Sequence, residues 1–229
     1  MSRRGDWPGG AMPERSLAVF ARAPVVGRVK TRLAQEIGAH EAVALYQRLG
    51  RRVVAASIGP GYRTIVWFTP ATARTAVRAW LDGLGVSDFR VQTGGGLGTR
   101  LVQAFGRLFG EGDGAVVVIG TDCPGVDRRL IAAAFAALRS YDVVLGPARD
   151  GGYYLVGLRG PQPALFRGIP WSTHEVTRAT RARAGALGLS CRLLAPLRDV
   201  DTARDARALG LLGRTYRCPS PHRGAGAGG

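Results

Sequence analysis

The single lysine of this chain is the residue whose type most directly suggests chemistry. All but one of the 32 basic side chains are arginine, the exception is Lys30, and the chain has no asparagine. A coding bias explains this composition, so a lysine that survives it is a candidate for a function that arginine cannot supply. A compact ammonium makes a point contact with a phosphate, whereas a planar guanidinium requires a fork-shaped site. Chance survival of one lysine at an exposed helix start is the alternative.

The loop around this lysine, residues 21–33, has the composition of a phosphate-binding segment. It contains Gly27 and carries Arg22, Lys30 and Arg32 between a predicted strand and the start of a helix. Backbone N–H groups at a helix N-terminus attract anions, and nearby cations add to that attraction. Because the spacing of the Walker motif is missing, we predict a phosphate site of another kind. A basic surface loop is the alternative.

Carboxylates follow two other predicted strands. Asp122 comes directly after the β-branched run V-V-V-I-G-T, and Asp199 and Asp201 follow the last strand. A carboxylate at the tip of a buried strand is costly unless it is paired or binds a metal. Since Mg²⁺ typically takes one or two protein carboxylates, we predict a Mg²⁺ or Mn²⁺ site with Asp122 and Asp201 as ligands. The alternative is that these aspartates cap the helices that follow them.

Two glycine-rich turns also follow predicted strands. The first lets the backbone approach a flat ligand closely, and its candidate nucleotide-binding residues are Gly94, Gly95, Gly96 and Leu97. The second places Asp150 before Gly151 and Gly152, where the turn presents a carboxylate to an acceptor or a metal. A flexible turn and an ordinary β-turn are the respective alternatives.

Alternating strands and helices must position these residues. Strands are predicted at 17–21, 64–68, 89–92, 115–120, 143–146, 153–157 and 192–195, and helices at 41–57, 72–81, 99–109, 128–138, 175–187 and 202–212. This alternation indicates an α/β fold with a mostly parallel sheet covered by helices on both sides. In such sheets ligands bind at the carboxyl ends of the strands, which is where all the candidate residues fall.

The composition predicts one domain, residues 16–213, between disordered tails at 1–15 and 214–229. The net charge of +16 comes from arginines scattered through every segment, which argues against nucleic-acid binding. Three widely spaced cysteines argue against a disulfide scaffold or a zinc site. No apolar run is long enough for a membrane span or a signal peptide, so we expect a cytoplasmic protein.

Taken in order, the motifs F-A-R-A-P-V-V-G-R-V-K-T-R-L, G-G-G-L-G-T-R, G-T-D-C-P-G, L-G-P-A-R-D-G-G-Y-Y-L, P-W-S-T and D-V-D-T resemble the DUF2064 family. That family is glycosyltransferase-like and belongs to the nucleotide-diphospho-sugar transferase (GT-A) superfamily. Parts of the pattern are also similar to phospholactate and molybdenum-cofactor guanylyltransferases. The resemblance implies a three-layer, Rossmann-like GT-A domain.

The resemblance also implies roles for individual residues. Lys30 and Arg32 would hold the phosphates of a nucleotide, the loop at 94–98 would pack on its base, and Asp122 would occupy the metal position, aided by Asp201. The acceptor-binding residues would be Gly151, Gly152, Tyr153 and Trp171. A strict D-x-D motif is missing, because Cys123 and Pro124 follow Asp122.

These observations predict a metal-dependent transferase with a nucleotide donor and a small-molecule acceptor. The leading interpretation is glycosyl transfer from an NDP-sugar, with Asp150 and Lys30 as catalytic residues. Nucleotidyl transfer from an NTP uses the same apparatus and is the first alternative. A nucleotide or polyanion binder without catalysis is the second.

Overall fold

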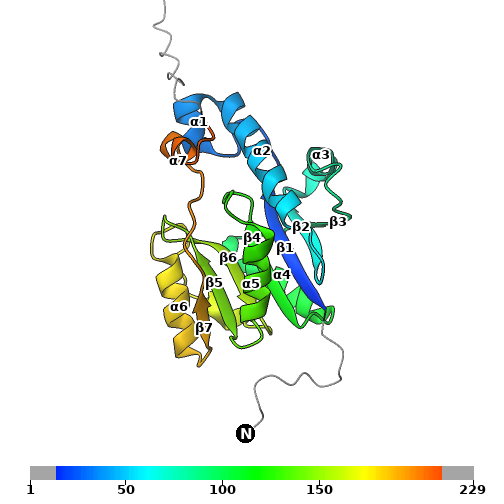
Figure 1. The fold of residues 1–229 in the computed structure, drawn as a ribbon, viewed down its shortest axis with the longest axis vertical. Helices are drawn as coiled ribbons and strands as arrows, with labels where there is room; N and C mark the ends of the chain where they lie inside the picture. Colours follow the sequence, from blue (N-terminus) through cyan, green and yellow to red (C-terminus); the bar gives the residue numbers. More distant parts are fainter. Residues whose placement is uncertain (1–13, 213–229) are drawn as a thin grey trace, which may run out of the picture.

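The computed structural model describes residues 14–212, which form one seven-stranded sheet between two layers of helices (Figure 1). The strands are β1 (Arg15–Arg22), β2 (Arg63–Thr69), β3 (Asp88–Val91), β4 (Ala115–Gly120), β5 (Val143–Pro147), β6 (Tyr153–Leu158) and β7 (Cys191–Leu193). Their order in the sheet is β3-β2-β1-β4-β6-β5-β7. Only β6 runs antiparallel to its neighbours, so the predicted mostly parallel sheet is confirmed.

Helices cover both faces of this sheet. They are α1 (Thr31–Ile37), α2 (Ala39–Ala56), α3 (Arg74–Trp80), α4 (Leu97–Gly110), α5 (Arg128–Ala137), α6 (Val176–Ala186) and α7 (Ala203–Ala208), with short 3₁₀ helices η1 (Ala71–Ala73) and η2 (Pro163–Phe166). One core cluster joins α2, α3 and α5 to the sheet, and another joins α4, η2 and α6 to the opposite face. A third cluster packs α1, α2 and α7 together.

The central strands show why the sheet needs two layers. In β4, Val117 and Ile119 belong to one core cluster, while Val116 and Val118 belong to the other. Successive side chains of a strand point to opposite faces, so a continuous β-branched run buries its apolar groups only when both faces are covered. The predicted three-layer architecture is therefore confirmed.

Three details differ from the sequence prediction. The segment from Thr31 forms a separate short helix, α1, where only a helix start was expected. The predicted helix at 202–212 ends at Ala208, because Gly210 takes a φ of +67° and the N–H of Leu211 donates back to Ala206 O at 2.8 Å. This left-handed glycine is a typical helix stop. The tails expected at 1–15 and 214–229 lie almost wholly outside the described residues, and Arg15 is the first residue of β1.

A charged network lies at the amino edge of the sheet, opposite the edge where ligands are expected. The fully buried Asp113 carboxylate accepts hydrogen bonds from the Ser16 hydroxyl at 2.8 and 2.9 Å and pairs with Arg63 at 2.9 Å. Arg63 also pairs with Glu111, which in turn pairs with Arg90. Because each buried polar group has a partner, this edge ties together the starts of β1, β2 and β3. Within residues 14–212, no helix is both long and apolar enough to cross a bilayer.

Replacing Asp113 by alanine is expected to lower the free energy of unfolding by about 2 kcal/mol, because it leaves a buried hydroxyl and a guanidinium without their acceptor. Urea unfolding measures this change. Asp88→Ala is the matched control, since Asp88 pairs with Arg90 but its side chain is 37% exposed, and exposed pairs contribute about 0–1 kcal/mol. Equal losses of unfolding free energy in the two variants would show that the burial of Asp113 does not increase its contribution to stability.

Candidate active site

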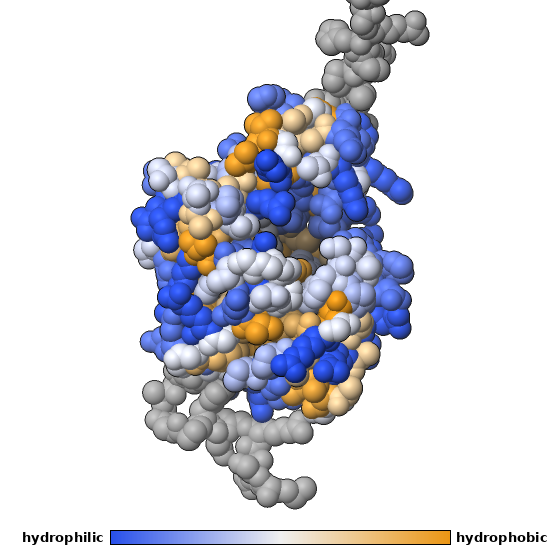
Figure 2. All heavy atoms as spheres, turned by 180° about the vertical axis from the view of Figure 1, so that it is seen from behind, coloured by the Kyte–Doolittle hydropathy of each residue, from blue (hydrophilic) through white to orange (hydrophobic). Residues whose placement is uncertain are grey.

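Two adjoining cavities open at the carboxyl edge of the parallel strands. The first cavity has a volume of about 470 Å³ and the second about 740 Å³, within the range of small-molecule sites. Figure 2 shows a hollow in the surface, bordered by hydrophilic residues, between the upper part of the molecule and the body below it. The two cavities share a wall, made of Arg32, Leu97, Gly120, Asp122, Tyr153, Tyr154 and Asp201.

Lys30, on the wall of the first cavity, lies between two carboxylates of the shared wall. Its Nζ is 2.6 Å from Asp122 Oδ1 and 2.9 Å from Asp201 Oδ1, and its side chain is only 5% exposed. Burial alone lowers the pKa of the ammonium, but the charges of Asp122 and Asp201 outweigh it and hold that pKa above its ordinary value. The lysine therefore stays charged and neutralises much of the charge of the two aspartates.

The backbone of Lys30 is also unusual. Its φ of +49° and ψ of +45° place it in the left-handed region, which a residue with a side chain occupies only when its surroundings hold it there. The double ion pair supplies that hold. The sequence predicted a phosphate contact for Lys30, and in this structure its ammonium is committed to Asp122 and Asp201.

Neither Asp122 nor Asp201 caps the helix that follows it, so the alternative role suggested by the sequence does not apply. Asp127 caps α5, since its Oδ1 accepts a hydrogen bond from the Leu130 N–H at 2.8 Å. Thr202 caps α7, in a capping box with Asp205. Asp122 and Asp201 are thus left for the site.

The other members of the predicted phosphate loop surround the first cavity. Arg22 and Arg32 line it, and Arg22 Nη1 donates a hydrogen bond to Arg28 O at 3.2 Å. Gly27 takes a φ of +73° in the turn between them, so its role is in shaping the loop rather than in lining the cavity. Two guanidinium groups therefore border the cavity close to the Lys30 ammonium.

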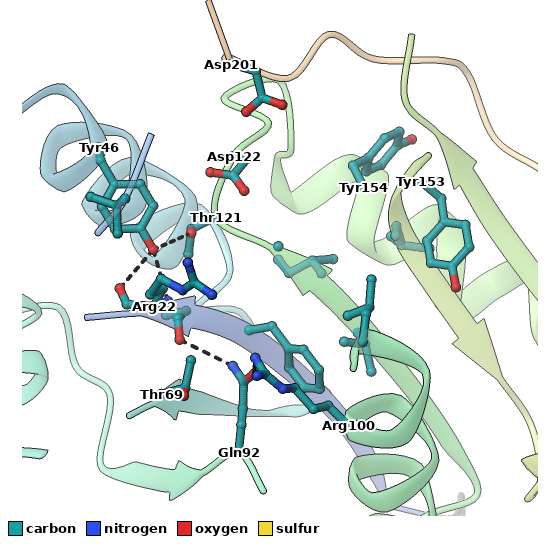
Figure 3. Close-up of a pocket in the computed structure, with 18 of the residues that line it drawn as sticks. Arg22, Tyr46, Thr69, Gln92, Arg100, Thr121, Asp122, Tyr153, Tyr154 and Asp201 are labelled. Atoms are coloured by element: carbon teal, nitrogen blue, oxygen red, sulfur yellow. Dashed lines mark hydrogen bonds between the residues drawn. The ribbon is translucent and has the colours of Figure 1, made fainter. Parts of the chain in front are cut away.

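Tyr46, on α2, is a site residue that sequence reasoning missed. Its hydroxyl accepts from the Arg22 N–H at 3.0 Å, donates to Arg22 O at 2.9 Å and accepts from the Thr121 hydroxyl at 3.2 Å (Figure 3). It thereby joins the carboxyl ends of β1 and β4. No local signal could have found it, because a tyrosine on the apolar face of an amphipathic helix has the pattern of a core residue.

The glycine-rich loop contributes less to the cavity wall than expected. Leu97 lines both cavities, and Gly94, Gly95 and Gly96 form the turn before α4. Gly98 has a packing role, because a Cβ there would lie 2.7 Å from Trp171 Nε1. Two further residues that sequence reasoning missed line the first cavity, namely Gln92 and Arg100.

Four carboxylates line the second cavity, and three of them form a close cluster. Ligand oxygens of Asp150, Asp199 and Asp201 lie within 4.8 Å of one another. Burial, together with the charges of Asp150 and Asp201, raises the pKa of Asp199 to about 6. Carboxylate oxygens are the donors that Mg²⁺ and Mn²⁺ prefer, so this cluster has suitable chemistry for a divalent cation. It contains Asp201 of the predicted metal pair, whereas Asp122 is the partner of Lys30.

The Asp150 loop is fixed by its neighbours. Asp150 Oδ1 accepts from the Gly152 N–H at 2.8 Å, and Gly151 O accepts from the Thr177 N–H at 2.9 Å. Gly151 has a φ of +94°, and a Cβ there would lie 2.0 Å from His174 O. Asp150 thus lies in a tight turn, and that turn also holds its carboxylate at the second cavity. The two interpretations of this segment are therefore compatible.

The remaining predicted acceptor residues border the same cavity. Gly152, Tyr153 and Trp171 line it, with the Tyr153 and Trp171 rings edge-on at 6.2 Å, while the tight packing of Gly151 gives it a supporting role. Figure 3 shows the Tyr153 hydroxyl pointing away from Asp122 and Asp201. Cys123 also lines the cavity, but burial raises the pKa of its thiol well above the usual range, so it has no features of a nucleophile.

Comparison with known proteins identifies the family. The family described as "Uncharacterized protein conserved in bacteria (DUF2064)" matches residues 53–173, more than half of the chain. The chain belongs to the DUF2064 family. This confirms the resemblance that the motifs indicated.

Three proteins to which this DUF2064 chain is similar are described as enzymes that use nucleotides. The crystal structure of a provisionally assigned nucleotide-diphospho-sugar transferase from Desulfovibrio desulfuricans G20 is 32% identical, with a TM-score of 0.81, over 86% of this chain and 87% of that one. A phosphoenolpyruvate guanylyltransferase from Chloroflexus aggregans is 29% identical over 171 residues, 72% of this chain and 81% of the relative. CMP:2-keto-3-deoxy-manno-octonic acid synthetase, complexed with CTP, has the same fold at 14% identity, with a TM-score of 0.55 over 86% of this chain and 96% of that one.

Replacing Gly151 by alanine is expected to destabilise this DUF2064 protein by about 2 kcal/mol or more, because the new methyl group would overlap the backbone of His174. Thermal or urea unfolding measures the loss. Gly168→Ala is the matched control: Gly168 has a φ of +70° and nothing within 4 Å of its added Cβ, so it carries the backbone strain without the overlap. Similar losses in both variants would mean that the contact with His174 is unimportant.

The raised pKa of Asp199 predicts a pH dependence of stability. In the native protein Asp199 holds its proton up to about pH 6, while an unfolded aspartate loses it near pH 4. Its contribution to stability is therefore present below about pH 4 and is lost as the pH rises through about 6. Asp199→Asn, which mimics the protonated acid, should raise the melting temperature of metal-free protein at about pH 8 and have little effect at about pH 4.

Thermal unfolding in the presence of a chelator, at both pH values, tests this expectation. Asp82→Asn, a change at an exposed aspartate outside both cavities, is the control. A lower melting temperature of Asp199→Asn at the higher pH would contradict the expectation, because the ionised Asp199 would then stabilise the native protein.

Proposed function

We propose that this protein is a metal-dependent glycosyltransferase that moves a sugar from a nucleotide diphosphate donor to a small, uncharged hydroxyl compound. The observation that carries the proposal is the junction of the two cavities. A cavity bordered by cations meets a cavity lined by four carboxylates. Asp122 and Asp201 belong to both cavities, and Lys30 pairs with the two of them from the first. A transfer between two substrates needs such a junction.

The first cavity suits the nucleotide half of the donor. Apolar side chains, among them Phe20 and Leu101, line one part of it, and Arg22 and Arg32 border another. A base and ribose need apolar and polar walls, and a diphosphate needs cations. Arg22 and Arg32 would balance the charge that grows on the leaving diphosphate, which is the main form of catalysis available for such groups. Lys30 would neutralise Asp122 and Asp201, so that these carboxylates do not repel the diphosphate.

Asp199 and Asp201 are the residues that would hold a divalent cation in this arrangement. Burial, and then the charges of Asp150 and Asp201, raise the pKa of Asp199. A cation would relieve the repulsion among these carboxylates, so the donor set fits Mg²⁺ or Mn²⁺. Such an ion, when bound, supplies Lewis-acid stabilisation of the diphosphate. Asp122 would keep Lys30 in place through their ion pair at 2.6 Å.

The second cavity suits a neutral acceptor. Four carboxylates line it against the one guanidinium of Arg32, and the Trp171 ring forms part of its wall. A polyhydroxyl compound can stack on an aromatic ring and donate hydrogen bonds to carboxylates, whereas an anionic acceptor would be repelled by them. This charge distribution favours transfer to a sugar or polyol.

Asp150 would act as the general base. Its Oδ1 is engaged by the Gly152 N–H, so its second oxygen is the one available to an acceptor hydroxyl. As the hydroxyl oxygen bonds to the anomeric carbon of the donor, its proton passes to Asp150. The bond from that carbon to the β-phosphate oxygen breaks, and the nucleoside diphosphate leaves with the electron pair. Direct displacement of this kind inverts the anomeric centre.

Nucleotidyl transfer is the second candidate, and a specific finding favours it. The relative from Chloroflexus aggregans is a phosphoenolpyruvate guanylyltransferase. That reaction joins an acidic acceptor to the α-phosphate of an NTP and releases pyrophosphate. The acidic second cavity of the present protein is the feature that speaks against an acceptor of this class.

A product assay separates the two reactions. The protein is incubated with Mn²⁺ or Mg²⁺, NDP-sugars and a panel of neutral sugars and polyols, and separately with NTPs and phosphoenolpyruvate. We expect release of nucleoside diphosphate in the first set. Lys30→Ala and Asp150→Asn should each lower the rate by about 100-fold or more, and Asp82→Asn should leave it unchanged.

Pyrophosphate release in the second set alone would overturn the proposal in favour of nucleotidyl transfer. Absence of any nucleotide-dependent thermal shift would overturn both reactions. A nucleotide at about 100 times its dissociation constant stabilises a protein by about 2.7 kcal/mol, which moves the melting temperature by several degrees. Binding that survives in Lys30→Ala, without turnover in the unmodified protein, would indicate a nucleotide binder without catalysis.

A further inference from the structure

A guanidinium without an acidic partner lies on the wall of the first cavity. Arg100, in the first turns of α4, donates from Nε to Gly95 O at 3.0 Å and from Nη1 to Gln92 Oε1 at 3.3 Å. A guanidinium carries five N–H donors, so these two hydrogen bonds leave one N–H of Nη1 and both N–H groups of Nη2 for a ligand, and a fork of one donor from each nitrogen remains. In the part of the chain that the structure describes, no carboxylate forms an ion pair with Arg100.

Gln92 fixes this guanidinium in place. The glutamine is 8% exposed, and its Nε2 donates to Trp67 O at 2.7 Å and to Ala21 O at 3.3 Å. Both partners are carbonyl oxygens, so the amide nitrogen must face them and Oε1 must face Arg100. A buried polar group with all its partners in place is rigid. The Arg100 fork is therefore held in one orientation before any ligand binds.

The position of this pair within the cavity indicates what it contacts. Figure 3 shows Gln92 and Arg100 side by side at one end of the drawn pocket, with Asp122 and Asp201 at the other end. Apolar side chains of Phe20 and Leu101 line the same cavity. A ligand with its phosphates at the end marked by Asp122 and Asp201, where Lys30 lies, would thus reach Arg100 with its opposite end, which in a nucleotide is the base.

We propose that Arg100, positioned by Gln92, selects the donor by its base and accepts a base edge that has two adjacent hydrogen-bond acceptors. Guanine offers O6 and N7, and cytosine offers O2 and N3. Adenine places an amino donor beside each of N1 and N7, and uracil places an N–H between its two carbonyls. An arginine fork pairs with two acceptors, so adenine and uracil donors are rejected. This inference rests on the proposed nucleotide donor site.

Binding of GDP, CDP, ADP and UDP to the full chain with Mn²⁺, measured by calorimetry, tests the inference. We expect GDP or CDP to bind about tenfold or more tightly than ADP and UDP, which corresponds to one good bidentate pair. Comparing GDP with CDP shows which of the two bases is the natural one. Arg100→Lys should bring the four affinities to within about threefold of one another, because an ammonium lacks the fork geometry.

Gln92→Met tests the positioning role without touching the guanidinium. It should reduce discrimination between bases while leaving the affinity for inorganic pyrophosphate unchanged. If Gln92 only stabilised the fold, Gln92→Met would lower the affinities for all nucleotides and for pyrophosphate together. Arg48→Lys, on the exposed side of α2, is the control and should change nothing.

The outcomes distinguish this inference from the proposed function. Equal binding of all four nucleotides, or preference for ADP or UDP, overturns the role of Arg100 and leaves the donor site standing. Unchanged discrimination in Arg100→Lys overturns it as well. Absence of binding by every nucleotide overturns the donor site itself, and the inference with it.

Discussion

A buried ammonium held between two carboxylates is the interaction on which the site depends. Lys30 reaches Asp201 across 171 positions in the chain and Asp122 at the end of β4. The three residues belong to the loop before α1, the strand end and the segment before α7, so one cation adds a charged contact among three segments that also touch through the Val200 N–H to Asp122 O hydrogen bond and the packing of α1 on α7. Removing it would leave two aspartates close together without compensation, and the left-handed backbone at Lys30 would lose its support.

The pKa values of two carboxylates, Glu111 and Asp199, are shifted in opposite directions at the two edges of the sheet. At the amino edge, Glu111 lies among Arg63, Arg90 and Arg107, and although burial alone raises its pKa, these partners lower it to about 2. At the carboxyl edge, burial and neighbouring carboxylates raise the pKa of Asp199 to about 6. The ion pairs of Glu111 stabilise the fold. The crowded carboxylates around Asp199 destabilise it unless they bind a cation. Perturbed groups of the second kind concentrate at functional sites, which is why the chemistry is assigned to that edge.

Rigid support surrounds the two cavities. Tyr46 joins the ends of β1 and β4, Gln92 orients Arg100, and the packing of Gly151 against His174 holds Asp150. None of these supports would contact the reacting atoms in the proposed transfer. They set where the charged groups stand before a substrate binds, and a preorganised site loses little energy to rearrangement during the reaction.

Local sequence patterns predicted all seven strands, most of the helices and the edge of the sheet where the candidate residues lie, while the separate helix α1 was missed. The β-branched run before Asp122 required a covered central strand, and each candidate loop followed a strand, so Lys30, Asp122, Asp150 and Asp201 were found from local patterns. The partners of these residues could not be predicted in the same way. Which carboxylates face Lys30, that Asp199 joins Asp150, and that Tyr46 and Gln92 support the cavity all depend on side chains that are distant in sequence. Local sequence patterns indicate which residues are buried and where turns form. Contacts between residues that are distant in sequence depend on how the helices and strands pack, which no local pattern specifies.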